Sequence, residues 1–121
     1  MFYDSHKKLR VWQEAMNLVV IVYRIQQDFP KYEMYALCDQ LRRAVVSVCC
    51  NIAEGNARQH EKERKQFFYI ALGSLAETQT LLEIAIRLQY IASVSEEIVN
   101  LSESVSKMLS GLIGHRPSAI E

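Results

Sequence analysis

The chain has 121 residues, a length typical of one domain, and half of them are hydrophobic while only six are glycine or proline. This composition excludes a disordered chain, and no apolar run approaches the roughly 18 residues that a membrane span needs. The 14 basic and 14 acidic residues balance to zero net charge, which argues against a protein that coats nucleic acid non-specifically.

The charge is unevenly distributed along the chain. Residues 1–65 carry 11 Lys or Arg and 8 Asp or Glu, a net of +3, whereas residues 66–121 carry 3 and 6, a net of −3. A basic surface therefore has to come from the first half. The N-terminus lacks the apolar core and small-residue cleavage site of a signal peptide, so we expect a cytoplasmic protein. The odd set Cys38, Cys49 and Cys50 falls in one expected helix, which favours buried reduced thiols over disulfides, metal binding or catalysis.

The first expected helix runs from about His6 to Asp28, with Asp4 or Ser5 as its cap, and carries two apolar rows. One row is Leu9, Trp12, Met16, Val19 and Tyr23; the other is Val11, Ala15, Leu18, Val22 and Ile25. A helix with two apolar faces is buried on two sides. We expect one side to face the core and the other a partner subunit, because four such helices cannot fully surround one of their number.

The second expected helix runs from about Glu33 to Glu54. Pro30 ends the first helix, and the short connection makes the second antiparallel to it. Its apolar row is Leu37, Leu41, Ala44, Val45, Val48 and Ile52. Gly55 stands where a left-handed residue commonly follows a helix.

A polar row runs beside that apolar row and consists of Gln40, Arg43, Ser47, Asn51 and Glu54. Polar side chains between packed helices usually satisfy one another, so we expect a mainly structural row bonded to the third helix. In an antiparallel hairpin turning near Ala57, Arg43 would lie within about a turn of Glu77 and pair with it.

The third expected helix follows the connection 56–60 and runs to about Tyr90. It opens with a charge cluster, Arg58 to Lys65, which is either a solvated helix start or an anion or nucleic-acid contact. Gly73 and Ser74, in mid-helix, suggest the close approach of another helix.

The fourth expected helix begins near Ser93, which forms a capping box with Glu96. Its single apolar stripe, which includes Ile98, Val105 and Leu112, is typical of an outer helix. The whole chain is predicted to be all-α: one up-down-up-down antiparallel four-helix bundle over residues 1–121, with a frayed tail at 115–121.

No catalytic or metal constellation stands out. His6, His60 and His115 lie on separate segments without ligand-spaced partners, and no phosphate loop, nucleophile elbow or Cys-x-x-Cys is present. We therefore expect no enzyme, no catalytic residue, no metal, no cofactor and no small-molecule substrate.

Four segments carry a resemblance: VWQEAMNLV (Val11–Val19), FPKYEMYALCDQLRRAVVSV (Phe29–Val48), NIAEG (Asn51–Gly55) and IALGSLAETQTLLEIAIRLQYI (Ile70–Ile91). Over about residues 8 to 92 the chain resembles the four-helix-bundle family of proteins from intervening sequences of bacterial 23S rRNA genes. It is similar in expected fold to the accessory variability proteins of diversity-generating retroelements. It departs from the usual family pattern, which has Pro and Ser at Cys49 and Cys50, Gly at Ala57 and Gln89, Ser at His60 and Phe at Arg64.

The resemblance implies a homo-oligomer, a pentameric ring in particular, without enzymatic activity. It also implies a suspected association with RNA, and the retroelement relatives contact a reverse transcriptase and nucleic acid through basic surface. Arg42, Arg43, Asn51, Glu54 and Gly55 match family-typical positions. The candidates for a nucleic-acid contact are Lys7, Lys8, Arg10, Arg42, Arg58, Lys62, Arg64 and Lys65. The alternative is a structural protein–protein scaffold that binds no nucleic acid.

Overall fold

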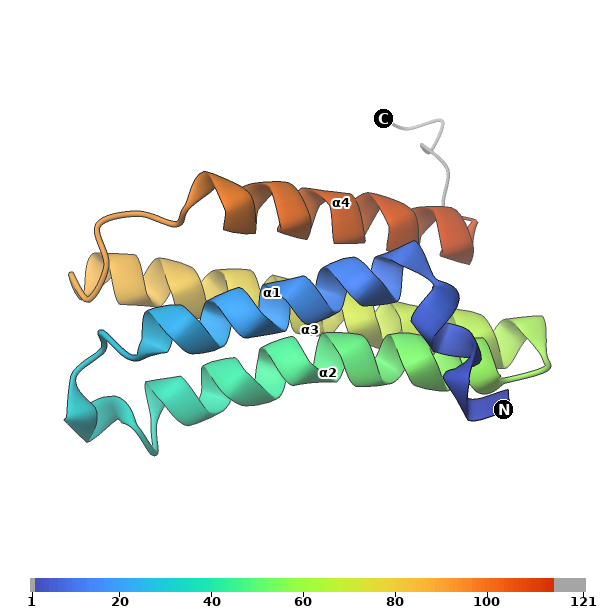
Figure 1. The fold of residues 1–121 in the computed structure, drawn as a ribbon, viewed down its shortest axis with the longest axis horizontal. Coiled ribbons are helices and arrows are strands. Elements are labelled where there is room, and N and C mark those ends of the chain that lie inside the picture. The colour runs from blue at the N-terminus through green and yellow to red at the C-terminus, as the bar shows by residue number, and fades with distance from the viewer. Residues whose placement is uncertain (1, 115–121) are drawn as a thin grey trace.

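The computed structural model describes residues 2–114, with side chains from Ser5 onward, and these residues form helices and their connections without strands. The four long helices are α1 (Arg10–Gln26), α2 (Leu37–Ala57), α3 (Glu61–Arg87) and α4 (Glu96–Ile113), and they run alternately up and down (Figure 1). Two short 3-10 helices, η1 (Phe2–Lys8) and η2 (Lys31–Glu33), precede α1 and α2. The predicted all-α four-helix bundle is confirmed, while the predicted fraying of residues 115–121 lies outside the described residues.

Each helix packs against two neighbours. The pairs in contact are α1 with α2, α2 with α3, α3 with α4 and α4 with α1, so α1 and α3 occupy diagonal corners. Each helix presents one apolar row to the shared core, whose most deeply buried large side chains are Leu18, Val22, Leu41, Val45, Val48, Ile52, Phe68, Leu82, Ile98, Val105 and Leu109. Truncation of such a leucine or isoleucine to alanine costs about 2–5 kcal/mol, so these rows hold the bundle together.

Gly55 lies inside α2 and not in a left-handed turn after it, so its predicted role was wrong. It is buried against α3, and a Cβ atom added there would lie 2.6 Å from Cε1 of Phe68. Glycine at this position lets the last turn of α2 approach the first turns of α3. The left-handed glycine in the described part of the chain is Gly114, which ends α4.

The starts of α1 and α2 come later than predicted. Residues 2–8 form η1, so α1 begins at Arg10 and not at His6, and Leu9 occupies its N-cap position without a side-chain cap. Glu33 belongs to η2, outside α2, where its Oε1 accepts a hydrogen bond from the N–H of Leu37 at 3.2 Å. A carboxylate thus caps α2 from outside the helix and satisfies one of its free amides.

The turn between α3 and α4 also differs from the prediction. α3 ends at Arg87, and the chain turns through Gln89, whose φ of 65° lies in the left-handed region. Two backbone bonds, from Tyr90 N–H to Ala85 O and from Gln89 N–H to Ile86 O, both 2.9 Å, complete a Schellman motif. The cap of α4 is Ser95 and not Ser93: its Oγ accepts the Ile98 N–H at 3.2 Å.

Candidate functional site

The structure gathers seven of the eight basic candidates at one end of the bundle. This basic end comprises η1, the start of α1 and the turn from α2 into α3 (Figure 1). Its candidates are Lys7, Lys8, Arg10, Arg58, Lys62, Arg64 and Lys65. Arg42 lies in the first half of α2, toward the opposite end.

Arg64 points inward and serves the end of α2. Its Nη1 donates to the carbonyl oxygens of Gly55, Asn56 and Arg58 at 3.4, 3.3 and 3.5 Å, and its guanidinium lies 5.5 Å from the ring centroid of Phe68. The last carbonyls of a helix have no partner within it, and a cation there also complements the helix dipole. Arg64, at the position where the resemblance implies phenylalanine, is therefore a helix cap, a role that a local charge pattern does not reveal.

Arg58 and Arg10 form ion pairs on the surface of the basic end. Arg58 Nη2 lies 2.8 Å from Glu54 Oε2, with the guanidinium 4.8 Å from the ring centroid of Phe67. Arg10 Nε lies 2.7 Å from Glu14 Oε2, and its side chain is 78% exposed. Exposed pairs of this kind contribute about 0–1 kcal/mol, so both guanidiniums can exchange their carboxylate for a phosphate.

Arg42 holds the connection between α1 and α2. Its Nη2 donates to the Met34 carbonyl at 2.9 Å and its Nη1 to Gln26 Oε1 at 3.2 Å. Gln26 Nε2 in turn donates to the Cys38 carbonyl at 3.2 Å. These bonds give Arg42 a structural role at the end opposite the other candidates.

The basic end carries four lysines, Lys7, Lys8, Lys62 and Lys65, and all of them except Lys65 are exposed. Lys8 and Lys62 are exposed, and within the described residues their side chains form no hydrogen bond or ion pair. Lys65 is half-buried, with its Nζ 3.8 Å from where a Cβ on Gly114 would lie, close to the C-terminus of α4. Lys8 and Lys62 are therefore the basic side chains best placed to meet a phosphate.

The polar row of α2 bonds to α3 at one point. Ser47 Oγ lies 2.8 Å from Ser74 Oγ, and Asn51 Nδ2 donates to both Ser47 O and Ser47 Oγ at 2.8 and 2.9 Å. The predicted pair between Arg43 and Glu77 is wrong, because Arg43 Nε lies 3.0 Å from Asp39 Oδ2 on its own helix.

The outer members of that row make no bond to α3. Glu54 pairs with Arg58, as described above. Gln40 of α2 and the predicted α3 partner Glu77 are both exposed, and neither side chain has a bonding partner in the part of the chain that the structure describes. The row is thus a hydrogen-bonded core at Ser47 and Asn51 with solvated ends.

Gly73 has no neighbour where one was expected. No heavy atom lies within 4 Å of a Cβ built on it, and it faces outward from α3, so the predicted close approach of another helix does not occur at Gly73 within the described chain. The adjacent Ser74, in contrast, is buried and bonded to Ser47 of α2. A glycine in an exposed helix interior costs about 1 kcal/mol relative to alanine. Nothing inside the bundle offsets that cost.

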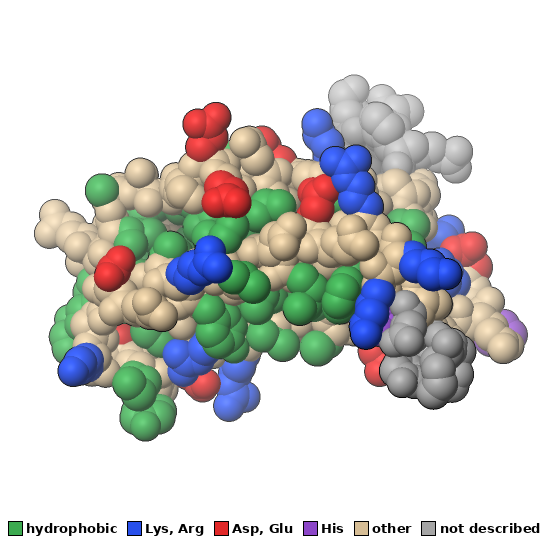
Figure 2. Space-filling model, in the orientation of Figure 1, with side chains coloured by type: hydrophobic (Ala, Val, Ile, Leu, Met, Phe, Trp, Pro, Cys, Tyr) green, Lys and Arg blue, Asp and Glu red, His purple; other side chains and the backbone are tan. Residues whose placement is uncertain are grey.

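The apolar row of α1 that includes Trp12, Met16, Val19 and Tyr23 is left partly uncovered, together with the neighbouring Val20. Met16, Val20 and Tyr23 are 37%, 44% and 42% exposed, and Trp12 and Val19 beside them are partly buried. We call these five residues the α1 face. Figure 2 shows hydrophobic side chains gathered along α1 and between α1 and α2. A contiguous exposed apolar surface of this kind marks an interaction site more often than a free surface.

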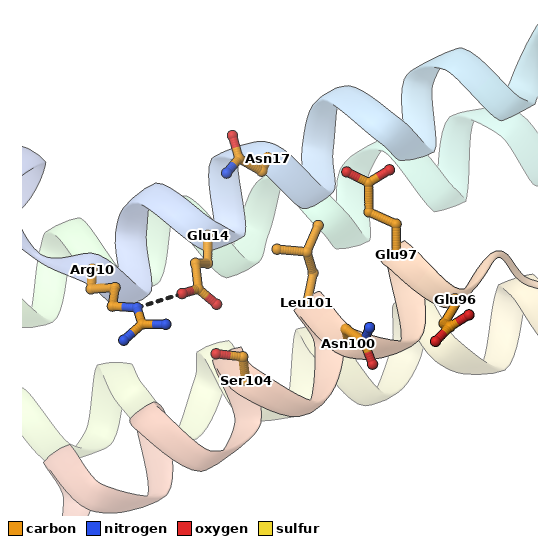
Figure 3. Close-up of a pocket in the computed structure, with 8 residues that line it drawn as sticks. All are labelled: Arg10, Glu14, Asn17, Glu96, Glu97, Asn100, Leu101 and Ser104. Carbon is orange, nitrogen blue, oxygen red and sulfur yellow. Dashed lines mark hydrogen bonds and ion pairs between the residues drawn. The ribbon is translucent and has the colours of Figure 1, made fainter.

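A polar groove separates α1 from α4 (Figure 3). Glu14 and Arg10 reach into it from α1, opposite Leu101 and Ser104 of α4. The pKa of Glu14 lies below its usual value, chiefly because the Ser104 hydroxyl donates to the carboxylate and Arg10 adds to the effect, while burial opposes both. Within the described residues no group of His, Cys, Asp or Glu is placed to hold a metal ion. Within the groove, Glu14 thus interacts with Arg10 of its own helix and with Ser104 of α4.

The cysteines are reduced, and their environments differ. Cys38 and Cys49 are buried as predicted, whereas Cys50 is exposed, so that part of the prediction was wrong. Burial raises the pKa of the Cys49 thiol to about 12, with the neighbouring Cys50 adding to the shift. A thiol that stays protonated at neutral pH is not a nucleophile.

Comparison with known proteins identifies the family. The model of the 23S rRNA-intervening sequence protein family matches residues 7–111. The chain belongs to this family. A crystal structure of a protein of unknown function from the S23 ribosomal protein family of Bacteroides thetaiotaomicron VPI-5482 is similar in fold, with a TM-score of 0.73 and 25% identity over 85% of this chain and 97% of that one. No curated protein matches the chain.

Membership of the 23S rRNA-intervening sequence family confirms the resemblance seen in the four sequence segments. The structure gives a physical reason for the glycine in one of those segments: Gly55, the last residue of NIAEG, is the residue that Phe68 packs against. Among the described residues, none of the helices is both long and apolar enough to cross a membrane.

Proposed function

We propose that this member of the 23S rRNA-intervening sequence family is a non-enzymatic homo-oligomer, with five copies favoured by the resemblance, that acts as an adaptor by binding RNA at its basic end. The observation that carries the proposal is the uncovered α1 face. Met16, Val20 and Tyr23 are each more than a third exposed on one helix. Covering them in an oligomer would recover about 25 cal/mol for each Å² of apolar area removed from water.

The basic end supports the RNA part of the proposal. Lys8 and Lys62 extend outward there, and Arg10 and Arg58 are held only by surface ion pairs. A few charges on one copy bind weakly, but repeating them around a ring raises the overall affinity through effective concentration. Zero net charge is then no obstacle, since the basic residues act together.

The distribution of titratable side chains over the described residues supports an adaptor over an enzyme. Among the described residues the titratable side chains are spread along the helices, and Glu14, the one carboxylate with a lowered pKa, is held by Ser104 and Arg10. A catalytic site needs several such groups converging on one point.

The test combines light scattering with RNA binding at low and high salt. The proposal expects a particle several times larger than 14.0 kDa, and RNA binding that weakens steeply as salt rises. Lys8→Glu with Lys62→Glu should abolish binding, whereas Lys31→Glu with Arg43→Glu, an equal charge change at the opposite end, should leave most of it. No RNA binding by the unmodified protein at low salt would remove the RNA part.

A structural protein–protein scaffold is the second candidate function. It is favoured because Arg42 and Arg64 donate to backbone carbonyls of the protein itself, so fewer of the eight basic candidates are left to contact RNA. In this case the protein forms the same oligomer but binds no RNA in the low-salt experiment.

A further inference from the structure

A second apolar face lies on the outer side of α3. It contains Tyr69, Ile70, Ile84 and Leu88, which are 56%, 50%, 40% and 50% exposed. Ile70, Gly73, Glu77, Ile84 and Leu88 follow one another at helical spacing and so share one side of the helix. We call this surface, from Tyr69 to Leu88, the α3 face.

The two faces belong to different parts of the bundle. α1 and α3 occupy diagonal corners, and their backbones make no close contact in the described structure, so the α1 face and the α3 face are separate patches. An assembly that joins two different patches is heterologous, and it closes into a ring when the rotation between copies permits. A contact between two identical patches would instead stop at a dimer.

The faces complement each other in shape. The α1 face carries the large side chains of Met16, Val20 and Tyr23. The α3 face has Gly73 between its apolar residues, with no atom within 4 Å of the Cβ position. A glycine without a neighbour leaves room for the side chains of an approaching helix, and this explains a glycine that nothing within the chain requires.

The faces also complement each other in charge. Arg24 follows Val20 by four residues on α1, and Glu77 lies between Gly73 and Ile84 on α3. Both side chains are exposed, and within the described residues neither forms an ion pair. Most other surface arginines of the helices, such as Arg10, Arg43, Arg58 and Arg87, already pair with a carboxylate one turn away.

We infer that the α1 face of one copy packs against the α3 face of the next copy, with Arg24 of the one facing Glu77 of the other. The inference rests on the proposed homo-oligomer and says which surfaces form its interface. It does not depend on RNA binding.

The first test uses two variants that each destroy one face. Val20→Glu with Met16→Glu removes the α1 face, and Ile70→Glu with Ile84→Glu removes the α3 face. All four positions are exposed, so circular dichroism should show folded helices in both variants. Each variant alone should be a monomer of 14.0 kDa, because every contact needs one α1 face and one α3 face and each variant keeps only one of the two.

Mixing the two variants gives the decisive result. One intact α3 face and one intact α1 face remain, so the mixture should form a one-to-one dimer of twice 14.0 kDa and nothing larger. If either variant alone keeps the full oligomer, or the mixture stays monomeric, the inference is overturned.

The second test exchanges the charges. Arg24→Glu and Glu77→Arg should each weaken assembly at least about tenfold, because like charges then meet across the interface. The double variant should return to within about threefold of the unmodified protein, since the pair is restored with its signs reversed. Arg43→Glu, outside both faces, is the control and should change nothing.

The outcomes separate this inference from the proposed function. A monomeric unmodified protein would overturn the homo-oligomer and the interface together. Two other results would overturn the interface alone. One is an oligomer that stays intact in the unmodified protein and in both single charge variants. The other is a double variant that assembles as weakly as either single variant.

Discussion

Gly55 and Phe68 are in such close contact that a Cβ atom on the glycine would lie 2.6 Å from Cε1 and 2.9 Å from Cδ1 of the ring. Phe68 is fully buried, so the ring has little room to move away. This contact fixes how closely the end of α2 approaches the start of α3, and it therefore also positions the basic end of the bundle.

Gly55→Ala is expected to destabilise the protein by about 1–3 kcal/mol, the usual cost of overpacking a filled core. The measurement is chemical denaturation followed by circular dichroism. Gly111→Ala is the matched control, because this glycine of α4 has nothing within 4 Å of its Cβ position. That variant should gain about 0.5–1 kcal/mol from helix propensity. Equal effects of the two substitutions would contradict the role given to Phe68.

Gln89→Gly is expected to stabilise the protein by about 1–2 kcal/mol, because Gln89 has a φ of 65° and glycine adopts the left-handed region without a Cβ clash. The resemblance implies glycine here in most of the family, and the Schellman motif gives the reason. Gln79→Gly, within α3, should instead destabilise by about 1 kcal/mol. Loss of stability in both variants, measured by thermal unfolding, would contradict this reading.

The helices and the core could be predicted from the sequence because periodicity reports directly which residues share a helix face. Leu41, Val45, Val48 and Ile52 are fully buried, as their spacing indicated. The uncovered row of α1 was equally visible, since two apolar rows exceed what one bundle core can bury.

Helix ends and the roles of single polar residues could not be predicted in the same way. Gly55 looked like a helix terminator because the local signal for a left-handed turn is the same as that for close packing. Arg64 and Arg42 looked like surface charge, but each reaches backbone carbonyls that only the folded chain brings near. These contacts depend on tertiary structure, which local spacing does not encode.

Tyr90 links the end of α3 to the connection before α2, and this link should be sensitive to alkaline pH. Its hydroxyl donates to Glu33 Oε2 at 2.6 Å, and Tyr32 Oη lies 3.2 Å from Tyr90 Oη. The hydrogen bond to Glu33 is the main reason that the pKa of Tyr90 is raised, since ionisation would place two negative charges together.

The sign of the effect follows from that shift. The folded protein holds the Tyr90 proton more tightly than the unfolded chain, so this stabilisation is complete below the unfolded pKa of about 10 and is lost at higher pH. The free energy of unfolding of the unmodified protein should exceed that of Tyr90→Phe at neutral pH, and the gap should narrow above pH ~10. Tyr35→Phe, at an 88% exposed tyrosine, is the control and should follow the unmodified protein throughout. A gap that stays constant with pH would show that the bond to Glu33 does not contribute.

Arg64 and Lys62 are two cations, two residues apart at the start of α3, and they should contribute differently to stability and to RNA binding. Arg64→Gln should lower stability by about 1–2 kcal/mol, because the carbonyls of Gly55, Asn56 and Arg58 lose a charged donor. Lys62→Gln should change stability by less than about 0.5 kcal/mol, as is usual for an exposed side chain without a partner. The effects on RNA affinity at low salt should be reversed. The affinity should fall with Lys62→Gln and stay unchanged with Arg64→Gln under conditions where that variant is folded. Denaturation and RNA titration of the same two variants measure both effects. A loss of RNA binding with Arg64→Gln alone would show that the Arg64 guanidinium turns outward to meet the RNA and is not held as a helix cap.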